Sequence, residues 1–259
     1  MRKNYLLIIS LLTVLFACVQ EEKFPPKLTQ QVSNEKLKVT GIDSIHASVS
    51  TIEKSNSEHL PGCLEQLILS VNDFHEKNEG FIFDELKESW ETCKTEITTT
   101  ELKESAAIKW IEATGLLLQL TTDTKYGEEL QHVFLNSYNL EIKNRAASYV
   151  FTKNVDHIHI NLFLPAEINY QHSLAGDVQI LQETNYPESG KGEVHFSMSK
   201  RRYIELYIRI PSWADDAHVT VKGVKYFAPA GGYCKIAKKW REGDLVEIVF
   251  PGIHGKSVI

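Results

Sequence analysis

Cysteine is scarce in this sequence, and no two cysteines are neighbours. The four in the chain are Cys18, Cys63, Cys93 and Cys234. A site that needs an adjacent cysteine pair is therefore excluded. Three cysteines follow Cys18, an odd number that does not pair off completely within one chain, so at least one stays free, buried, metal-bound or intermolecular. Cys234 lies in a segment typical of a strand, which favours a buried core cysteine.

The chain also lacks an excess of positive charge. Lysine and arginine number 28 against 34 aspartates and glutamates, for a formal net charge of −6. Basic residues gather only in two short runs, 200–202 and 238–241, where turns between strands are expected. A protein that binds nucleic acid normally presents a basic face. The composition therefore predicts no nucleic-acid partner.

A long apolar run is missing as well. Two basic residues precede the apolar stretch 5–16, which is too short to span a membrane. The stretch leads into Leu15-Phe16-Ala17-Cys18, which resembles a bacterial lipobox. That resemblance implies cleavage before Cys18 and diacylation of its thiol, which would anchor the protein to a membrane. We therefore expect a signal peptide over 1–17 and a lipid-anchored protein of the bacterial cell envelope, periplasmic or on the outer-membrane surface. The alternative is an ordinary secretory signal with a chance cysteine.

The rest of the chain has globular composition, with 42% hydrophobic and 24% charged residues. Its length suffices for one large or two modest domains. Residues 18–40 are polar and contain two consecutive prolines, which is typical of a tether. Residues 41–150 are predicted to be helical and residues 151–255 to form strands. The sequence carries no signal for the oligomeric state.

Apolar residues in the first of these two parts recur at helical spacing. Three stripes fall within 60–74, 107–118 and 126–138. Asp123 is placed to cap the third helix, and the short link before it makes the last two helices antiparallel neighbours. The β-branched run 97–100 interrupts the helical pattern, and we expect a loop there.

From about residue 156 the period changes to two. Apolar side chains alternate with polar ones over 158–164, 204–210 and 246–250, with glycine- and proline-containing turns between them. Short strands with one apolar face predict an antiparallel β-sandwich. The expected fold class is thus α+β and multidomain, with a partial all-α segment followed by an antiparallel β-sandwich.

The order of motifs in the C-terminal part resembles glycoside hydrolase family 127, the β-L-arabinofuranosidase-like enzymes. The motifs are Glu183-Thr184-Asn185-Tyr186-Pro187, the strand 159–168, the strand ending in Pro211-Ser212-Trp213, and Trp240-Arg241-Glu242-Gly243-Asp244. The helical segment 110–139 resembles a helix pair of the same family. The resemblance implies that residues 41–150 are a remnant of an α/α barrel that carries catalysis. It therefore identifies the chain as an internally truncated member.

The family's catalytic zinc is held by a Glu-x-Cys pair and two later adjacent cysteines, one of which is the nucleophile. By this resemblance Glu91 and Cys93 match the zinc pair, and Glu79 matches the glutamate that serves as acid and base. The adjacent cysteines have no counterpart here, so zinc would have an incomplete site. The alternatives are that Glu79 is a plain surface carboxylate and that Glu91 and Cys93 are an ordinary pair.

Other residues allow two interpretations each. His157 and His159 share one face of a strand, either as metal ligands or as an exposed or packed pair. Trp213 and Trp240 either stack on sugars or close the core.

The resemblance implies a substrate class of arabinofuranose-containing glycans. The first hypothesis is a family 127-like glycosidase with reduced or lost activity. The second is a non-catalytic glycan-binding or scaffold lipoprotein of the cell surface that uses the sandwich. The third is a decayed copy whose shortened barrel exposes apolar helix faces.

Overall fold

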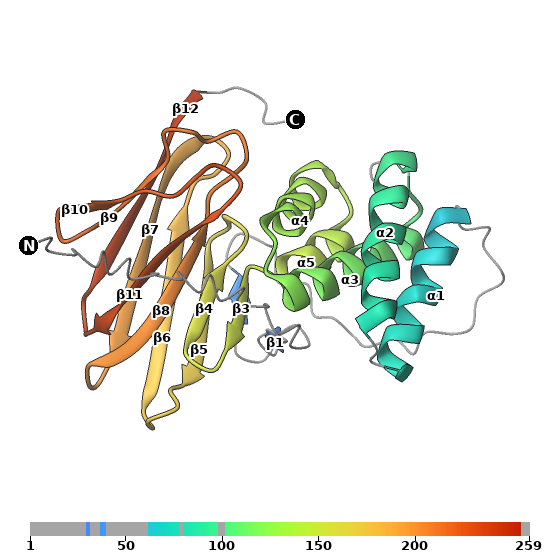
Figure 1. Cartoon of the computed structure of the whole chain (residues 1–259). Coiled ribbons are helices and arrows are strands. Elements are labelled where there is room, and N and C mark those ends of the chain that lie inside the picture. Colours follow the sequence, from blue (N-terminus) through green and yellow to red (C-terminus); the bar gives the residue numbers. More distant parts are fainter. Residues whose placement is uncertain (1–29, 32–36, 40–61, 78–79, 98–101, 255–259) are drawn as a thin grey trace, which may run out of the picture.

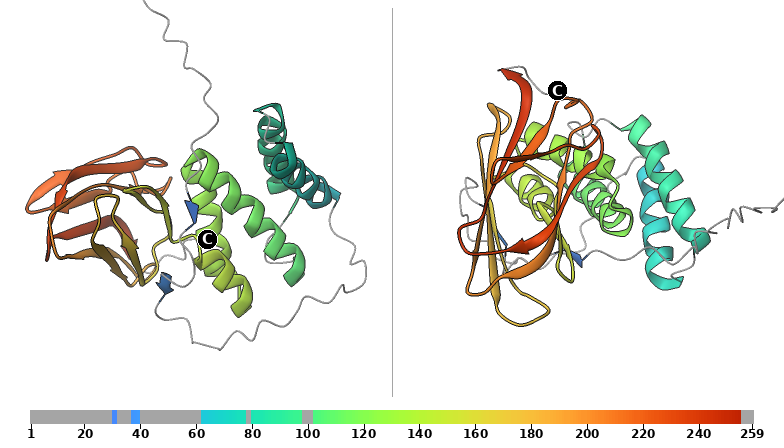
Figure 2. Two further views of the ribbon diagram at one scale, coloured as in Figure 1. Left: turned by 90° about the horizontal axis from the view of Figure 1, so that it is seen from below. Right: turned by 60° about the vertical axis from the view of Figure 1, so that its left-hand side comes forward.

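The computed structural model describes residues 30–31, 37–39, 62–77, 80–97 and 102–254 of the chain. Within these residues five helices are followed by a sandwich of two sheets (Figure 1). The helices lie at one end of the sandwich, side by side with it (Figure 2). The predicted fold class, α+β with a helical part before an antiparallel-rich sandwich, is confirmed.

The helical part consists of α1 to α5, with bounds Gly62–Lys77, Gly80–Glu96, Glu104–Thr121, Thr124–Asn136 and Leu140–Ala147. The three predicted stripes coincide with α1, α3 and α4. Asp123 caps α4 as predicted, because its side chain accepts a hydrogen bond from the backbone N–H of Lys125. The short helix α5 was not predicted from the sequence; Asn139 caps it by accepting from two backbone N–H groups.

The five-stranded sheet has the order β1-β3-β4-β8-β11. Its strands are Gln30–Gln31, Phe151–Asn154, His157–Ile160, Arg202–Arg209 and Tyr233–Trp240. Neighbouring strands are antiparallel except β4 and β8, which run parallel.

The seven-stranded sheet has the order β10-β9-β12-β7-β6-β5-β2 and is antiparallel throughout. Its strands are Val224–Tyr226, His218–Val221, Leu245–His254, Ser189–Met198, Asp177–Thr184, Ala166–Gln171 and Leu37–Val39.

Five residues of the segment 18–40, predicted as a tether, are described by the structure. Its residues 30–31 and 37–39 form β1 and β2, which pair with β3 and β5 at the edges of the two sheets. Backbone hydrogen bonding to an open sheet edge is independent of side-chain type, so a polar composition did not reveal it. The predicted signal peptide 1–17 and the loop residues 98–100 lie outside the described residues.

One apolar core runs through both parts of the chain. The two sheets bury their inward-facing aliphatic side chains against each other, and Trp240 is completely buried between them, stacked on Phe196 at 4.1 Å between ring centroids. Of the two interpretations for the tryptophans, Trp240 therefore closes the core. Trp213 is 37% exposed and contacts the edge of Phe250.

Helix α4 is attached to the end of the sandwich through a buried arginine. Arg209, at the end of β8, is 1% exposed, donates to the backbone oxygen of Asn161 and lies 3.8 Å from the carboxylate of Glu128 on α4. Gly127 allows this approach, because a Cβ there would lie 3.1 Å from Arg209 Cδ. The side chain of Arg209 thereby links α4 to the end of the sandwich.

No described helix is long and apolar enough to cross a membrane.

Candidate functional site

The residue matched to a zinc ligand, Cys93, is engaged in a disulfide. It lies on α2, is fully buried, and is bonded to Cys63 on α1 with 5.0 Å between the two Cα atoms. A disulfide sulfur carries no thiolate and is no zinc ligand. In this structure Cys93 is therefore paired with Cys63, and its predicted role as a zinc ligand stays a prediction. Because the partner is 30 residues away on another helix, the Glu-x-Cys spacing alone gave no sign of this pairing.

The other matched ligand, Glu91, faces solvent. Its side chain is 53% exposed and forms an ion pair with Lys125 at the start of α4. Among the described residues, neither Glu91 nor Cys93 belongs to a group of three potential metal ligands. A tight zinc site needs three or four ligands, so the residues present here do not fit zinc. Glu79 and Cys18 lie outside the described residues, and their roles stay predictions.

A buried carboxylate near this pair was missed by the sequence reasoning. Glu129 on α4 is 4% exposed, accepts a 2.8 Å hydrogen bond from Trp110 Nε1 and forms an ion pair with Lys94. Trp90 stacks on Trp110 and donates to Thr114. These hydrogen bonds and the ion pair join α2, α3 and α4.

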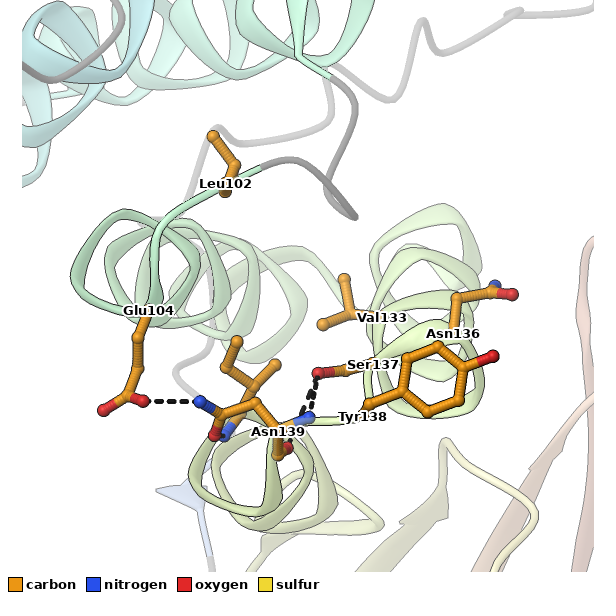
Figure 3. Close-up of a pocket in the computed structure, with 8 residues that line it drawn as sticks. Leu102, Glu104, Val133, Asn136, Ser137, Tyr138 and Asn139 are labelled. Carbon is orange, nitrogen blue, oxygen red and sulfur yellow. Dashed lines mark hydrogen bonds between the residues drawn. The ribbon is translucent and has the colours of Figure 1, made fainter.

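A hollow of about 310 Å³ opens where α4 meets α5 (Figure 3). Its only charged lining residue, Glu104, accepts a hydrogen bond from the Asn139 side chain, and Tyr138 stands fully exposed at its rim. The Ser137 hydroxyl accepts a hydrogen bond from the backbone N–H of Asn139, so this side chain and Glu104 hold the turn between α4 and α5.

The outward face of the five-stranded sheet carries the densest group of interacting polar and aromatic side chains. We define the tyrosine face as five residues of β4, β8 and β11: His157, Tyr203, Glu205, Tyr207 and Lys235. Strand pairing brings them together, because β8 aligns Glu205 with His157 on one side and Tyr207 with Lys235 on the other. These strands lie side by side in Figure 1.

Glu205 is at the centre of the tyrosine face. Its carboxylate accepts hydrogen bonds from Tyr203 (3.1 Å), Tyr207 (2.7 Å) and Lys235 (2.7 Å), and His157 Nε2 lies 3.5 Å away. The bonds from Lys235 and Tyr207 lower the pKa of Glu205 to about 2, and the same contacts raise the pKa of Lys235. The face thus presents two tyrosine rings fixed around an ionised carboxylate.

His159 lies on the same face of the sheet as His157, aligned with Tyr207 and covered by its aromatic neighbours. It is 6% exposed, stacks on Tyr207 with 4.4 Å between ring centroids, and meets Tyr233 edge-on. Burial, with a smaller contribution from His157, lowers the pKa of His159 to about 4, so the ring is neutral near pH 7. In this structure His159 is packed against the two tyrosines, whereas the side chain of His157 is 47% exposed and lies next to Glu205.

Comparison with known proteins identifies the sandwich. Residues 157–252 match the family described as beta-L-arabinofuranosidase, GH127 middle domain. No curated protein matches the chain. The predicted resemblance to glycoside hydrolase family 127 is confirmed.

Several solved structures are similar to part of this chain. A glycoside hydrolase is 24% identical with a TM-score of 0.48, covering 56% of this chain and 32% of that one. A GH127 β-L-arabinofuranosidase from Geobacillus stearothermophilus T6 is 22% identical with a TM-score of 0.44, covering 56% and 30%. A further GH127 β-arabinofuranosidase is 22% identical with a TM-score of 0.45, covering 56% and 31%. The match thus spans about a third of the length of those proteins.

Proposed function

We propose that this chain, whose sandwich is a GH127 middle domain, binds arabinofuranose-containing glycans and does not hydrolyse them through a cysteine nucleophile. It acts at the bacterial cell envelope, anchored through a lipid on Cys18. This is the second of the three hypotheses from the sequence, the non-catalytic glycan-binding or scaffold lipoprotein. The lipobox-like residues 15–18 support the anchor.

The observation that carries the proposal is the state of the cysteines. Cys63 and Cys93 are bonded to each other, and Cys234 is 2% exposed in the sandwich core, where burial raises its pKa to about 11. A nucleophilic cysteine must be an accessible thiolate near neutral pH. Among the described residues no cysteine meets that condition, so the retaining mechanism of the family has no nucleophile here.

The tyrosine face supports the binding part of the proposal. Tyr203 is 47% exposed, and Tyr207, on the other side of Glu205 along β8, is half-buried. A tyrosine ring gives an apolar surface for the C–H groups of a sugar, and its hydroxyl and neighbouring charged groups bond the sugar hydroxyls. Glu205 supplies an acceptor, and Lys235 and His157 supply donors, on both sides of the rings. Because hydrogen bonds already fix these groups, little conformational entropy is lost on binding.

The test is calorimetric titration of arabinofuranose polymers into lipid-free protein. We expect binding that Tyr203→Ala weakens at least tenfold and that Glu205→Gln also weakens. Tyr138→Ala is the matched control, since Tyr138 is a fully exposed tyrosine of the helical part, and it should bind like the wild type. Trp213→Ala distinguishes the alternative in which this half-exposed tryptophan stacks on the sugar.

Two outcomes contradict the proposal. One is the absence of binding to every arabinofuranose polymer. The other is turnover of an aryl β-L-arabinofuranoside that Cys93→Ala or Glu79→Ala abolishes, because turnover of that kind requires the catalytic site that the disulfide displaces.

A further inference from the structure

The outward face of the other sheet carries a group of three potential metal ligands. Glu183 lies on β6, and Glu193 and His195 lie on β7, the central strands of the seven-stranded sheet (Figure 1). One ligand atom of each lies within 4.8 Å of the others. Among the described residues this is the one group that brings three such atoms together.

Strand register places an unusual row of like charges here. Glu193 is aligned with Glu183 on β6 and with Glu247 on β12, so three glutamates stand side by side across three strands. Like charges directly opposite each other in a sheet are destabilising. Such a row therefore calls for a positive charge to offset the repulsion.

In the part of the chain that the structure describes, no lysine or arginine forms an ion pair with any of these three glutamates. Other acidic groups of the sandwich do have such partners: Glu205 contacts Lys235, and Asp244 contacts Lys222 at 2.8 Å. Among the described residues the ion pairs of the row are those with His195, whose Nε2 lies 3.1 Å from Glu183 Oε2 and 3.2 Å from Glu193 Oε2.

These distances match those between ligands of one metal ion. Zinc binds histidine nitrogen and carboxylate oxygen at about 2.0–2.2 Å in a tetrahedron, whose ligand atoms are then roughly 3.3 Å apart. The imidazole is also well placed: His195 is aligned with Leu181 on one side and Leu245 on the other, and its Nε2 is covered and makes no regular hydrogen bond. The Nε2 atom of His195 is thus presented to both carboxylates.

The geometry points to a divalent-metal site formed by Glu183, Glu193 and His195, suited to zinc or a similar transition metal. Mixed imidazole and carboxylate ligands favour these ions over magnesium or calcium. The three residues hold three positions, and a water molecule completes the coordination. The site lies on a different sheet from the tyrosine face and does not include Glu91 or Cys93. A test of metal binding here is therefore independent of the proposed function.

The test measures zinc and cobalt binding by tag-free, lipid-free protein, with calorimetry for zinc and visible absorption for cobalt. We expect one ion per chain, and at least tenfold weaker binding in His195→Ala and in Glu193→Gln. His218→Ala is the matched control: His218 is a half-buried histidine on the outward face of the same sheet, on β9, and its replacement should leave binding unchanged. Thermal melting shows whether each variant is folded.

The inference is overturned by no binding at micromolar zinc, by binding that His195→Ala and Glu193→Gln leave intact, or by zinc that Cys93→Ala removes. The last result would locate the metal at the pair matched by the family resemblance. Glu183→Gln gives a second check in case His195→Ala is unfolded, because it removes one ligand and also lowers the repulsion in the glutamate row.

Discussion

The disulfide between Cys63 and Cys93 makes a quantitative prediction. It closes a loop with a sequence separation of 30 residues and joins α1 to α2. For a loop of this size the restriction of the unfolded chain contributes roughly 3.5 kcal/mol to stability. A loss of that size lowers the melting temperature by roughly 7–14 °C for a domain of 150–250 residues. We therefore expect Cys63→Ala/Cys93→Ala to unfold at clearly lower urea concentration than the wild type.

The assay is urea unfolding of lipid-free protein that begins at residue 19, with and without reductant. Wild-type protein should be destabilised by reductant, and the double alanine variant should be indifferent to it. Thiol labelling gives an independent readout. The native oxidised protein should label at no cysteine, and after unfolding only Cys234 should react, since it is buried in the native state. Labelling of Cys93 in native protein without reductant would refute the pairing and reopen the zinc interpretation.

Three further perturbations test the packing of the described residues. Burial lowers the pKa of His159 to about 4, so the unfolded state binds more protons than the native state between pH 6.5 and 4. As the pH is lowered through that window, the free energy of unfolding should fall by up to about 3 kcal/mol. His159→Phe should remove this part of the pH dependence of urea unfolding. Trp240→Ala should cost about 3–5 kcal/mol in the same assay, because the ring is completely buried. Gly115→Ala should cost about 1–3 kcal/mol and lower the melting temperature, because the added Cβ would lie 2.0 Å from the Tyr149 ring; a neutral effect would show that the ring moves aside.

Local patterns were sufficient for much of the fold. The helical spacing over 107–118 and 126–138 placed α3 and α4, and Asp123 marked the start of α4. The alternation over 204–210 gave β8 with its buried and exposed faces in the correct phase. These predictions succeeded because helix and strand periodicity depends on the nearest neighbours in the sequence.

The side-chain contacts around the matched site residues depend on tertiary packing. The Glu-x-Cys motif identified a resemblance, but the partner of Cys93 is determined by how α1 packs against α2. The tyrosine face likewise depends on the parallel pairing of β4 with β8, which connects residues about 50 positions apart. The spacing of residues in the sequence predicts neither contact, because each joins two different helices or strands.

The amino-acid sequence was enough to establish the order of helices before strands, the lipobox-like residues 15–18, the lack of an adjacent cysteine pair and the relation to glycoside hydrolase family 127. The three-dimensional packing joins Cys93 to Cys63 in a disulfide and places Glu91 in an ion pair with Lys125. It also set the glutamate row of Glu183, Glu193 and Glu247 beside His195. The physical difference is range: periodicity and motifs reflect bonded neighbours, whereas disulfides, strand register and charge clusters arise only when distant segments pack together.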